Sequence, residues 1–263
     1  MTGAGVIVDV RADGRATLTL DRPDVHNAFD DRLIRRLTEE LAGLERDPKV
    51  RVLVIAAAGR SFSAGADLDW LKRAANYSAA ENLSDVEALA GMLKALNRFR
   101  HPTLAAVQGA AYGGGVGLVA CCDIAIASDR AQFSMSEVKL GLIPGTISPY
   151  VVAAMGERQA RRYMLTGERF DAGEAKRIGL VHEVVAAEAL AAAVDDVAGA
   201  LLANGPRAMA EVKDLIAAVS RRPVDDALIA DTAARFARVR ASDEGREGVA
   251  AFLEKRRPGW TKP

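Results

Sequence analysis

The chain has 263 residues, and because 50% of them are hydrophobic it can bury a sizeable core as one large domain, or as one domain with a small appendage. Its 35 lysines and arginines balance 35 aspartates and glutamates, which argues against bulk binding to nucleic acid or anionic membranes but leaves room for one local phosphate site. No signal-peptide pattern opens the chain, and no apolar run approaches the ~20 residues that span a bilayer, so we expect a cytoplasmic protein.

The cysteines and histidines indicate neither a disulfide framework nor a metal site. Cys121 and Cys122 are adjacent within an apolar run, so we expect two buried thiols in a reducing compartment. The histidines, at positions 26, 101 and 182, have no metal-type spacing.

The first part of the chain alternates strand and helix patterns. Residues 6–10 and 16–20 predict a hairpin across an Asp-Gly turn, and a helix is expected over about 31–46. The continuously apolar run 50–57 then predicts a strand buried on both faces of a sheet.

The same alternation continues toward the middle of the chain. Residues 69–75 predict a short helix, the polar stretch 76–84 a mobile segment near a ligand, and residues 85–100 an amphipathic helix. Buried strands are expected at 103–107 and 123–127. The unit of strand, glycine loop and helix thus recurs at roughly 50-residue spacing, which predicts an α/β domain of stacked βα turns.

From residue 147 onward the pattern is helical almost to the end. Helices are expected over 147–155, 157–166, 171–178, 187–203, 206–220, 224–240 and 243–255. An all-helical tail after an α/β body predicts a C-terminal layer that covers the site or a neighbouring subunit.

Two glycine loops that follow predicted strands are the first candidates for chemistry. Gly113, Gly114 and Gly115 leave backbone N–H groups uncovered at the start of a helix pattern, where the helix dipole favours a negative oxygen. A second loop contains Ala64. The N–H groups of Ala64 and Gly114 could together hold one carbonyl oxygen as it becomes an enolate. The alternative is that the glycines only allow a tight turn and close helix packing.

Other chemistries of glycine and serine loops fit the sequence poorly. A dinucleotide-binding loop would need glycine or alanine at Leu118, and no Gly-Lys-Ser/Thr follows for a phosphate loop. Ser61 and Ser63 do not stand in a Gly-x-Ser-x-Gly motif.

Glu137 is the best candidate for acid/base chemistry. It stands among Phe133, Met135, Val138 and Leu140, where desolvation would raise the pKa of its carboxyl group. Such a group could exchange a proton with a carbon acid near neutral pH. The alternative is a carboxylate that complements the dipole at a helix start.

Taken together, these stretches resemble the crotonase superfamily, that is, the enoyl-CoA hydratase/isomerase family. The most specific pair is Ala64-Gly65-Ala66-Asp67 with the triple glycine at 113–115. Further matches lie at 22–23, 26–28, 122–125, 131–133, 137, 140–145, 165–167, 175, 179–181 and 252–256. The likeness covers nearly the whole chain in the right order.

The resemblance implies an α/β fold, a crotonase-like spiral of ββα turns over residues 1–200, with a C-terminal helical trimerisation region over 201–263. It implies an acyl-CoA thioester as the partner and a homotrimer or a hexamer made as a dimer of trimers. Coenzyme A is then part of the substrate, so no separate cofactor is expected, and neither nucleic acid nor membrane is an expected partner.

The resemblance also assigns site residues. It implies that the amides of Ala64 and Gly114 hold the thioester carbonyl and that Glu137 transfers protons. The residues it places around the substrate are Ala66, Asp67, Leu68, Gly113, Gly117, Tyr150, Phe252 and Lys255. The last two match C-terminal positions that approach CoA, often from a neighbouring subunit.

Gly117 departs from the family pattern, because family hydratases usually carry a first glutamate at this position and a second where Glu137 stands. One remaining carboxylate favours a double-bond isomerase on simple grounds, since an isomerase needs a single shuttling base. Hydration needs one proton taken from water and one delivered to the α-carbon, and Glu137 could do both if the water bridges it to the substrate.

A finer likeness points to a subgroup of branched acyl-CoA hydratases. Residues 113–118, 136–144 and 146–152 look like enzymes that act on 3-methylglutaconyl-CoA in leucine breakdown, or on isohexenylglutaconyl-CoA in acyclic terpene breakdown. Such substrates carry a second carboxylate. Candidate partners for it are Lys72, Arg73 and Tyr77.

The sequence therefore predicts an enoyl-CoA hydratase-type lyase that adds water syn across the double bond of a branched 2-enoyl-CoA. One alternative is an enoyl-CoA isomerase that uses Glu137 alone. Another is a non-catalytic or RNA-binding member, since at least one relative in this family binds AU-rich RNA; the zero net charge disfavours it.

Overall fold

The computed structural model describes residues 5–261, and its body contains two sheets. The chain passes from the larger sheet to the smaller one at residues 57–61, 107–110 and 128–132. Within the described residues, the larger sheet has the order β1-β2-β3-β5-β7-β10 and is parallel except for the β1–β2 hairpin. Its strands are β1 (Val6–Val10), β2 (Arg15–Leu20), β3 (Val52–Ala57), β5 (Thr103–Val107), β7 (Ile124–Ser128) and β10 (Glu183–Val185).

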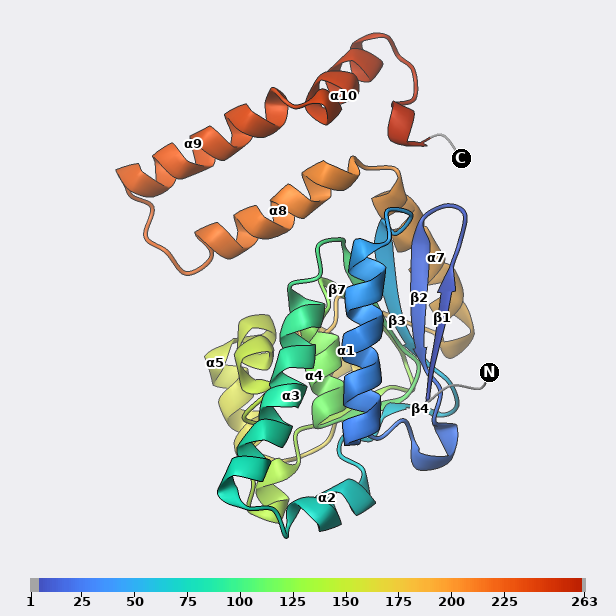
Figure 1. Ribbon diagram of the computed structural model, residues 1–263, viewed down its shortest axis with the longest axis vertical. Coiled ribbons are helices and arrows are strands. Elements are labelled where there is room, and N and C mark those ends of the chain that lie inside the picture. Colours follow the sequence, from blue (N-terminus) through green and yellow to red (C-terminus); the bar gives the residue numbers. More distant parts are fainter. Residues whose placement is uncertain (1–4, 262–263) are drawn as a thin grey trace.

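Helices cover both faces of the larger sheet, which explains the continuously apolar strands (Figure 1). On one face, Leu53 and Ile55 of β3 join the core under α1, α3, α4 and α5. On the other face, Val52 and Val54 pack with α7. These helices are α1 (Asp31–Arg46), α3 (Ala79–Asn97), α4 (Gly114–Cys121), α5 (Ser148–Thr166) and α7 (Leu190–Leu202).

The smaller sheet, with the order β4-β6-β8-β9, was not predicted. Its strands are β4 (Ser61–Ser63), β6 (Ala110–Tyr112), β8 (Gln132–Ser134) and β9 (Phe170–Asp171). They are too short to show a period in the sequence. The strands β4, β6 and β8 run parallel to one another, and this direction decides where the glycine loops lie.

One predicted element needs correction. The stretch 76–84 is not a mobile loop, because α3 begins at Ala79 and Ser78 forms a capping box with Glu81. Exposed polar side chains in the first turns of α3 hide the helical period. The element α5 is interrupted at Gly156, whose φ of 77° is not helical, so the two helices predicted over 147–155 and 157–166 are confirmed.

Three C-terminal helices, α8 (Pro206–Val219), α9 (Asp226–Arg240) and α10 (Asp243–Leu253), form what we call the C-terminal arm. Figure 1 shows the arm at the end of the body opposite α2 (Leu68–Ala74). Arg51 donates to the carbonyls of Leu202, Asn204 and Trp260, and so fixes the junction between α7 and the arm. The predicted division at residue 200 stays a prediction.

Three further expectations concern membrane-spanning helices, the two cysteines and metal binding. None of the described helices is long and apolar enough to cross a membrane. Both cysteines are free and buried, and burial raises the pKa of each thiol, so neither is poised as a nucleophile. In the part of the chain that the structure describes, no group of three His, Cys, Asp or Glu side chains could hold a metal ion.

Candidate active site

Three loops that carry candidate residues meet at one edge of the smaller sheet. The Ala64–Gly65–Ala66 loop follows β4, Gly113 follows β6, and Glu137 lies three residues beyond β8. Since β4, β6 and β8 are parallel neighbours, their carboxyl ends lie at the same edge. We call Gly65, Ala66, Gly113, Gly114 and Glu137 the catalytic cluster.

Glycine is required in this cluster because the backbones of the loops approach closely. A Cβ on Gly65, whose φ is 85°, would lie 2.9 Å from the carbonyl oxygen of Tyr112. A Cβ on Gly113, whose φ is 49°, would lie 3.1 Å from Oε1 of Glu137. Both the positive φ and the absence of space exclude larger residues, so glycine is what places the carboxyl group of Glu137 directly beside the backbone at Gly113.

The amide donor in the first loop belongs to Ala66 rather than to Ala64, so the sequence prediction for Ala64 is wrong. The N–H of Ala64 donates to the carbonyl of His26 over 2.9 Å, inside the fold. The carbonyl of Gly65 accepts from the N–H of Phe29 over 2.7 Å. In a trans peptide the N–H points opposite to the C=O, so the N–H of Ala66 points away from Phe29, and it has no acceptor among the described residues.

The second free amide belongs to Gly114. Gly114 is the first residue of α4, so its N–H has no partner within the helix, and none of the described residues accepts from it. The preceding carbonyl, of Gly113, accepts from Gly117 over 3.2 Å and so aligns the amide of Gly114 with the helix axis. The ring of Phe29 supports this turn, since a Cβ on Gly114 would lie 3.0 Å from it.

Glu137 begins a 3-10 helix, η2 (Glu137–Leu140), and its carboxyl group faces the cluster half-buried. Its Oε2 is buried and has no hydrogen-bond partner among the described residues. Burial raises the pKa of this carboxyl group, outweighing a hydrogen bond to its own backbone that lowers it. A carboxyl group with one unpartnered oxygen and a raised pKa is suited to exchanging protons with a ligand.

Gly117 lies one turn into α4, and its surroundings are filled by hydrocarbon. A Cβ there would collide with Cγ2 of Ile147, and it would lie 3.1 Å from Cβ of Ile147 and 3.5 Å from Leu93. Ile147 is 1% exposed, so it has little freedom to move aside. A glutamate at position 117 therefore does not fit this chain unless Ile147 changes as well, and one carboxylate remains.

Several residues expected around a substrate have other positions. The carboxylate of Asp67 accepts from the amides of Asp69 and Trp70 and so caps α2, while Leu68 is 74% exposed. The prediction that Tyr150 lies around the substrate is not supported by its position, because it lines a separate hollow at the far end of α4.

The remaining candidates also lie outside the cluster. Phe252 is 82% exposed in α10 and Lys255 follows it, so within one chain both lie at the arm, far from α2 (Figure 1). Lys72 pairs with Asp69 at 2.9 Å and Arg73 with Asp31 at 2.7 Å. Tyr77 lines a groove between α1 and α3. Lys72 and Arg73 are thus both already paired with carboxylates.

Comparison with known proteins agrees with this geometry. The sequence matches the enoyl-CoA hydratase/isomerase family over residues 11–263. The chain belongs to this family. A crystal structure of an enoyl-CoA hydratase from Shewanella pealeana has 45% sequence identity and a TM-score of 0.95, covering 97% of this chain and 96% of that one. For AtuE from Pseudomonas aeruginosa the identity is 36% and the TM-score 0.93, with 98% and 100% covered.

A third relative is 2,3-dehydroadipyl-CoA hydratase from Escherichia coli, with 32% identity over 242 residues and 92% of each chain covered. The predictions of the family, of an α/β crotonase fold with C-terminal helices, and of an enoyl-CoA hydratase-type enzyme are confirmed.

Sequence reasoning missed two supporting side chains, Phe29 and Ile147, and it placed the first amide donor two residues too early. The spacing of alternating strand residues gives no sign that Gly65 reverses the backbone at this loop. The bulk of Phe29 and Ile147 beside glycines becomes visible only when the packing is known.

Proposed function

We propose that this enzyme adds water syn across the double bond of a branched 2-enoyl-CoA, with Glu137 as its single acid/base group. The observation that carries the proposal is the juxtaposition of two free amides, of Ala66 and Gly114, with a carboxyl group that has one unpartnered oxygen. The two amides would stabilise the negative oxygen of the intermediate, and the carboxyl group would transfer the protons.

The two amides would stabilise the intermediate. When water attacks the β-carbon, the electron pair of the double bond moves to the α-carbon and is delocalised onto the thioester oxygen as an enolate. Donors fixed by the fold stabilise that oxygen without reorganising, and one such donor is typically worth about 3 kcal/mol of transition-state stabilisation. Both donors are fixed by backbone contacts, at the Phe29–Ala66 bridge and at the start of α4.

Glu137 would transfer both protons. Its carboxylate takes a proton from the attacking water as the carbon–oxygen bond forms, and the resulting acid delivers a proton to the α-carbon. Because one group acts from one face of the substrate, the addition is syn. The hydrocarbon at Gly117 and Ile147 supports this one-carboxylate scheme, since the space for a second acid is filled.

The branched acyl group is the finer part of the proposal. Leu140, Leu142 and Ile143 follow Glu137 directly and are 66%, 50% and 80% exposed, which offers an apolar surface beside the carboxyl group. The Escherichia coli relative acts, by its name, on an acyl-CoA that carries a second carboxylate. We infer that the acyl group here is branched and methylglutaconyl-like.

Incubation with crotonyl-CoA, 3-methylglutaconyl-CoA and a 3-enoyl-CoA tests the proposal. We expect water uptake on the 2-enoyl substrates, with the highest kcat/KM for 3-methylglutaconyl-CoA. If no 2-enoyl-CoA takes up water while the 3-enoyl-CoA shifts its double bond, the enzyme is the single-base isomerase that remains the alternative function. A preference for crotonyl-CoA would leave the hydratase in place and remove the branched substrate.

A further inference from the structure

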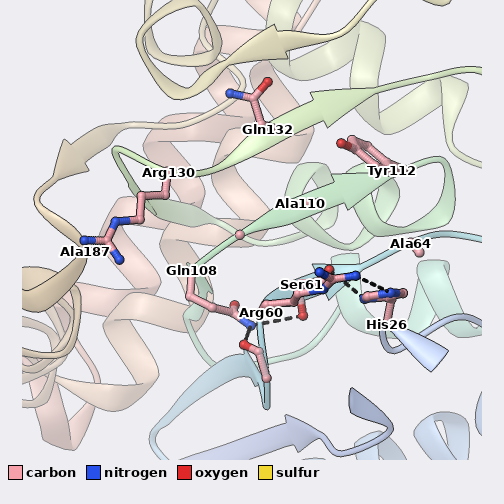
Figure 2. A pocket seen from close by; sticks show the side chains of 12 residues that line it. His26, Arg60, Ser61, Ala64, Gln108, Ala110, Tyr112, Arg130, Gln132 and Ala187 are labelled. Carbon is pink, nitrogen blue, oxygen red and sulfur yellow. Dashed lines mark hydrogen bonds between the residues drawn. The ribbon is translucent and has the colours of Figure 1, made fainter. Parts of the chain in front are cut away.

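Ser63 lies at the end of β4, directly before the first glycine loop, and its side chain is completely buried. Its neighbour Ser61 lines the hollow drawn in Figure 2, where the hydroxyl group of Ser61 lies 3.1 Å from Nδ1 of His26. Ser63 is not among the residues that line this hollow. Its hydroxyl group therefore makes its hydrogen bonds inside the fold.

The hydroxyl group of Ser63 joins two segments of backbone behind the catalytic cluster. Its Oγ donates to the carbonyl of Asn27 over 2.8 Å and accepts from the N–H of Gly65 over 3.3 Å. The carbonyl of Gly65 in turn accepts from the N–H of Phe29 over 2.7 Å. Gly65 is thus held on both sides of its Cα, at its N–H and at its C=O, which fixes the peptide that carries the N–H of Ala66.

This restraint acts on the residue of the loop whose backbone has the most freedom. Gly65 has a φ of 85°, and glycine populates positive φ about as readily as negative φ. Without a bond at its N–H, rotation about the backbone of Gly65 would change the direction of the N–H of Ala66 relative to that of Gly114. Both N–H groups must point at one oxygen if they are to stabilise it together.

Asn27 gives Ser63 a rigid acceptor. It is completely buried and adopts a φ of 54°, which is uncommon for a residue other than glycine. Its Nδ2 donates to the carbonyls of Ala58 and Ser61 over 2.9 and 2.8 Å, and its Oδ1 accepts from the N–H of Arg22 over 2.8 Å. Three bonds to backbone groups therefore hold Asn27 in a conformation that directs its carbonyl toward Ser63.

Ser63 also contacts the start of α4, which carries the second donor. A Cβ on Gly115 would lie 2.7 Å from the carbonyl oxygen of Ser63 and 3.0 Å from its Cβ. Gly115 follows Gly114 directly, so the position of Ser63 sets how closely the two glycine loops approach. One buried residue thus contacts the backbone beside both amide donors of the catalytic cluster.

We propose that Ser63 is a positioning residue for the reaction. Its hydroxyl group holds the peptide between Gly65 and Ala66 in the orientation at which the amides of Ala66 and Gly114 point to the same thioester oxygen. The inference rests on the proposed function, since it assigns to Ser63 an effect on the enolate that these two amides stabilise. Ser63 touches no reacting atom and acts through the backbone.

Ser63→Ala tests this role, and Ser128→Ala is its matched control. Ser128 is equally buried, and its Oγ likewise donates to a carbonyl, of Gln108 at 2.9 Å, and accepts from the N–H two residues further on, of Arg130 at 3.2 Å. Ser128 ends β7 in the larger sheet, whereas Ser63 precedes the catalytic cluster. Because both variants lose the same kinds of bond, we expect similar falls in Tm, of about 2–6 °C.

Only Ser63→Ala should change the chemistry. On the 2-enoyl-CoA that the wild type hydrates best, we expect its kcat to fall about tenfold with KM little changed, while Ser128→Ala keeps the wild-type kcat. Bound acetoacetyl-CoA gives a second readout, because its enolate absorbs in the near ultraviolet and donors at the thioester oxygen favour that form. The enolate absorbance at saturation should be lower for Ser63→Ala than for the wild type and the control.

Equal kcat and equal enolate absorbance in Ser63→Ala and Ser128→Ala would show that Ser63 only stabilises the fold, and this result would overturn the proposal. If Ser63→Ala does not fold, Ser63→Cys replaces it in the same comparison, because a thiol fills the position but donates and accepts only weakly. Failure of the proposed function is distinguishable. The wild type would then hydrate no 2-enoyl-CoA, while the enolate absorbance of bound acetoacetyl-CoA would still report on Ser63.

Discussion

The catalytic cluster and the C-terminal arm differ in where their large side chains lie. In the cluster, backbones touch because glycines leave out side chains, and the bulky residues behind them, Phe29 and Ile147, are buried. In the arm, large apolar side chains face outward. Those at least half exposed are Val212, Ile216, Ile229, Phe236, Val249, Phe252 and Leu253.

This difference shows that the cluster is complete within one chain, whereas the arm leaves apolar side chains uncovered. The amides and the carboxyl group of the cluster are positioned by contacts inside one chain. The large apolar side chains that the arm exposes are typical of an interaction surface. The homotrimer or hexamer stays a prediction. Substitutions in the cluster should therefore change kcat, whereas substitutions in the arm should change stability or assembly.

The largest effect is expected for Glu137→Gln. Loss of the only acid/base group in the cluster should lower kcat on the order of 10³-fold while CoA-ester binding is kept. The matched control is Glu157→Gln, which removes an exposed carboxylate that pairs with Arg161. Stopped-assay hydration rates and calorimetric binding would check this, and a fully active variant would show that another group moves the protons.

The same substitution should stabilise the protein. Burial raises the pKa of Glu137 in the folded state above its ordinary value of about 4.3. The folded state therefore binds more protons than the unfolded state between these two pKa values, and stability is lost as the pH rises through that window. Tm of Glu137→Gln should exceed that of the wild type at pH 7 and equal it below about pH 4, and wild-type kcat should fall as the pH drops through the raised pKa.

Gly114→Ala should have the next largest effect. Its new Cβ would lie 3.0 Å from the ring of Phe29, so the turn must shift and carry the amide of residue 114 with it. We expect kcat to fall about 10²-fold, with KM little changed. Gly91→Ala in α3 is the control, because it meets nothing within 4 Å and should add about 1 kcal/mol of stability. Partial recovery of kcat in Gly114→Ala/Phe29→Leu would confirm the steric cause; an unchanged kcat in the single variant would contradict it.

The packing of Gly117 against Ile147 predicts a coupled pair. Gly117→Ala should cost roughly 1–3 kcal/mol of unfolding free energy because it overpacks the space that Ile147 fills. Ile147→Ala alone should cost roughly 2–5 kcal/mol through the cavity it leaves. Urea unfolding of the double variant should show a cost at least 1 kcal/mol below the sum. Strict additivity would mean that the two residues do not compete for the same volume.

Tertiary contacts such as these could not be predicted from the sequence, although much of the fold could. The larger sheet and most helices could be predicted, because continuous apolar runs such as 52–57 and heptad-like spacing in α1 depend on burial alone. Glu137 and Gly114 could be found from residue type and position. The smaller sheet could not be predicted, since three-residue strands carry no period. Nor could the donor at Ala66, because it depends on a peptide orientation set by Phe29.

The smallest effect is expected at the base of the arm, for Lys213→Met. Nζ of Lys213 lies 2.6 Å from Oδ2 of Asp123 and 3.1 Å from the carbonyl of His101, which ties α8 to the body. Asp123 keeps its hydrogen bonds to the backbone and hydroxyl of Thr103. The variant should therefore lose only about 1 kcal/mol of unfolding free energy, or about 2–4 °C in Tm.

Amide exchange should accelerate in α8 but not in α4, and kcat should stay at the level of the control Lys49→Met, since Lys49 is exposed and its side chain forms no bond that the structure shows. A fall in kcat together with Tm would mean that the position of the arm contributes to the reaction. The cluster and the arm would then be parts of one site, and the separation between them would hold only within a single chain.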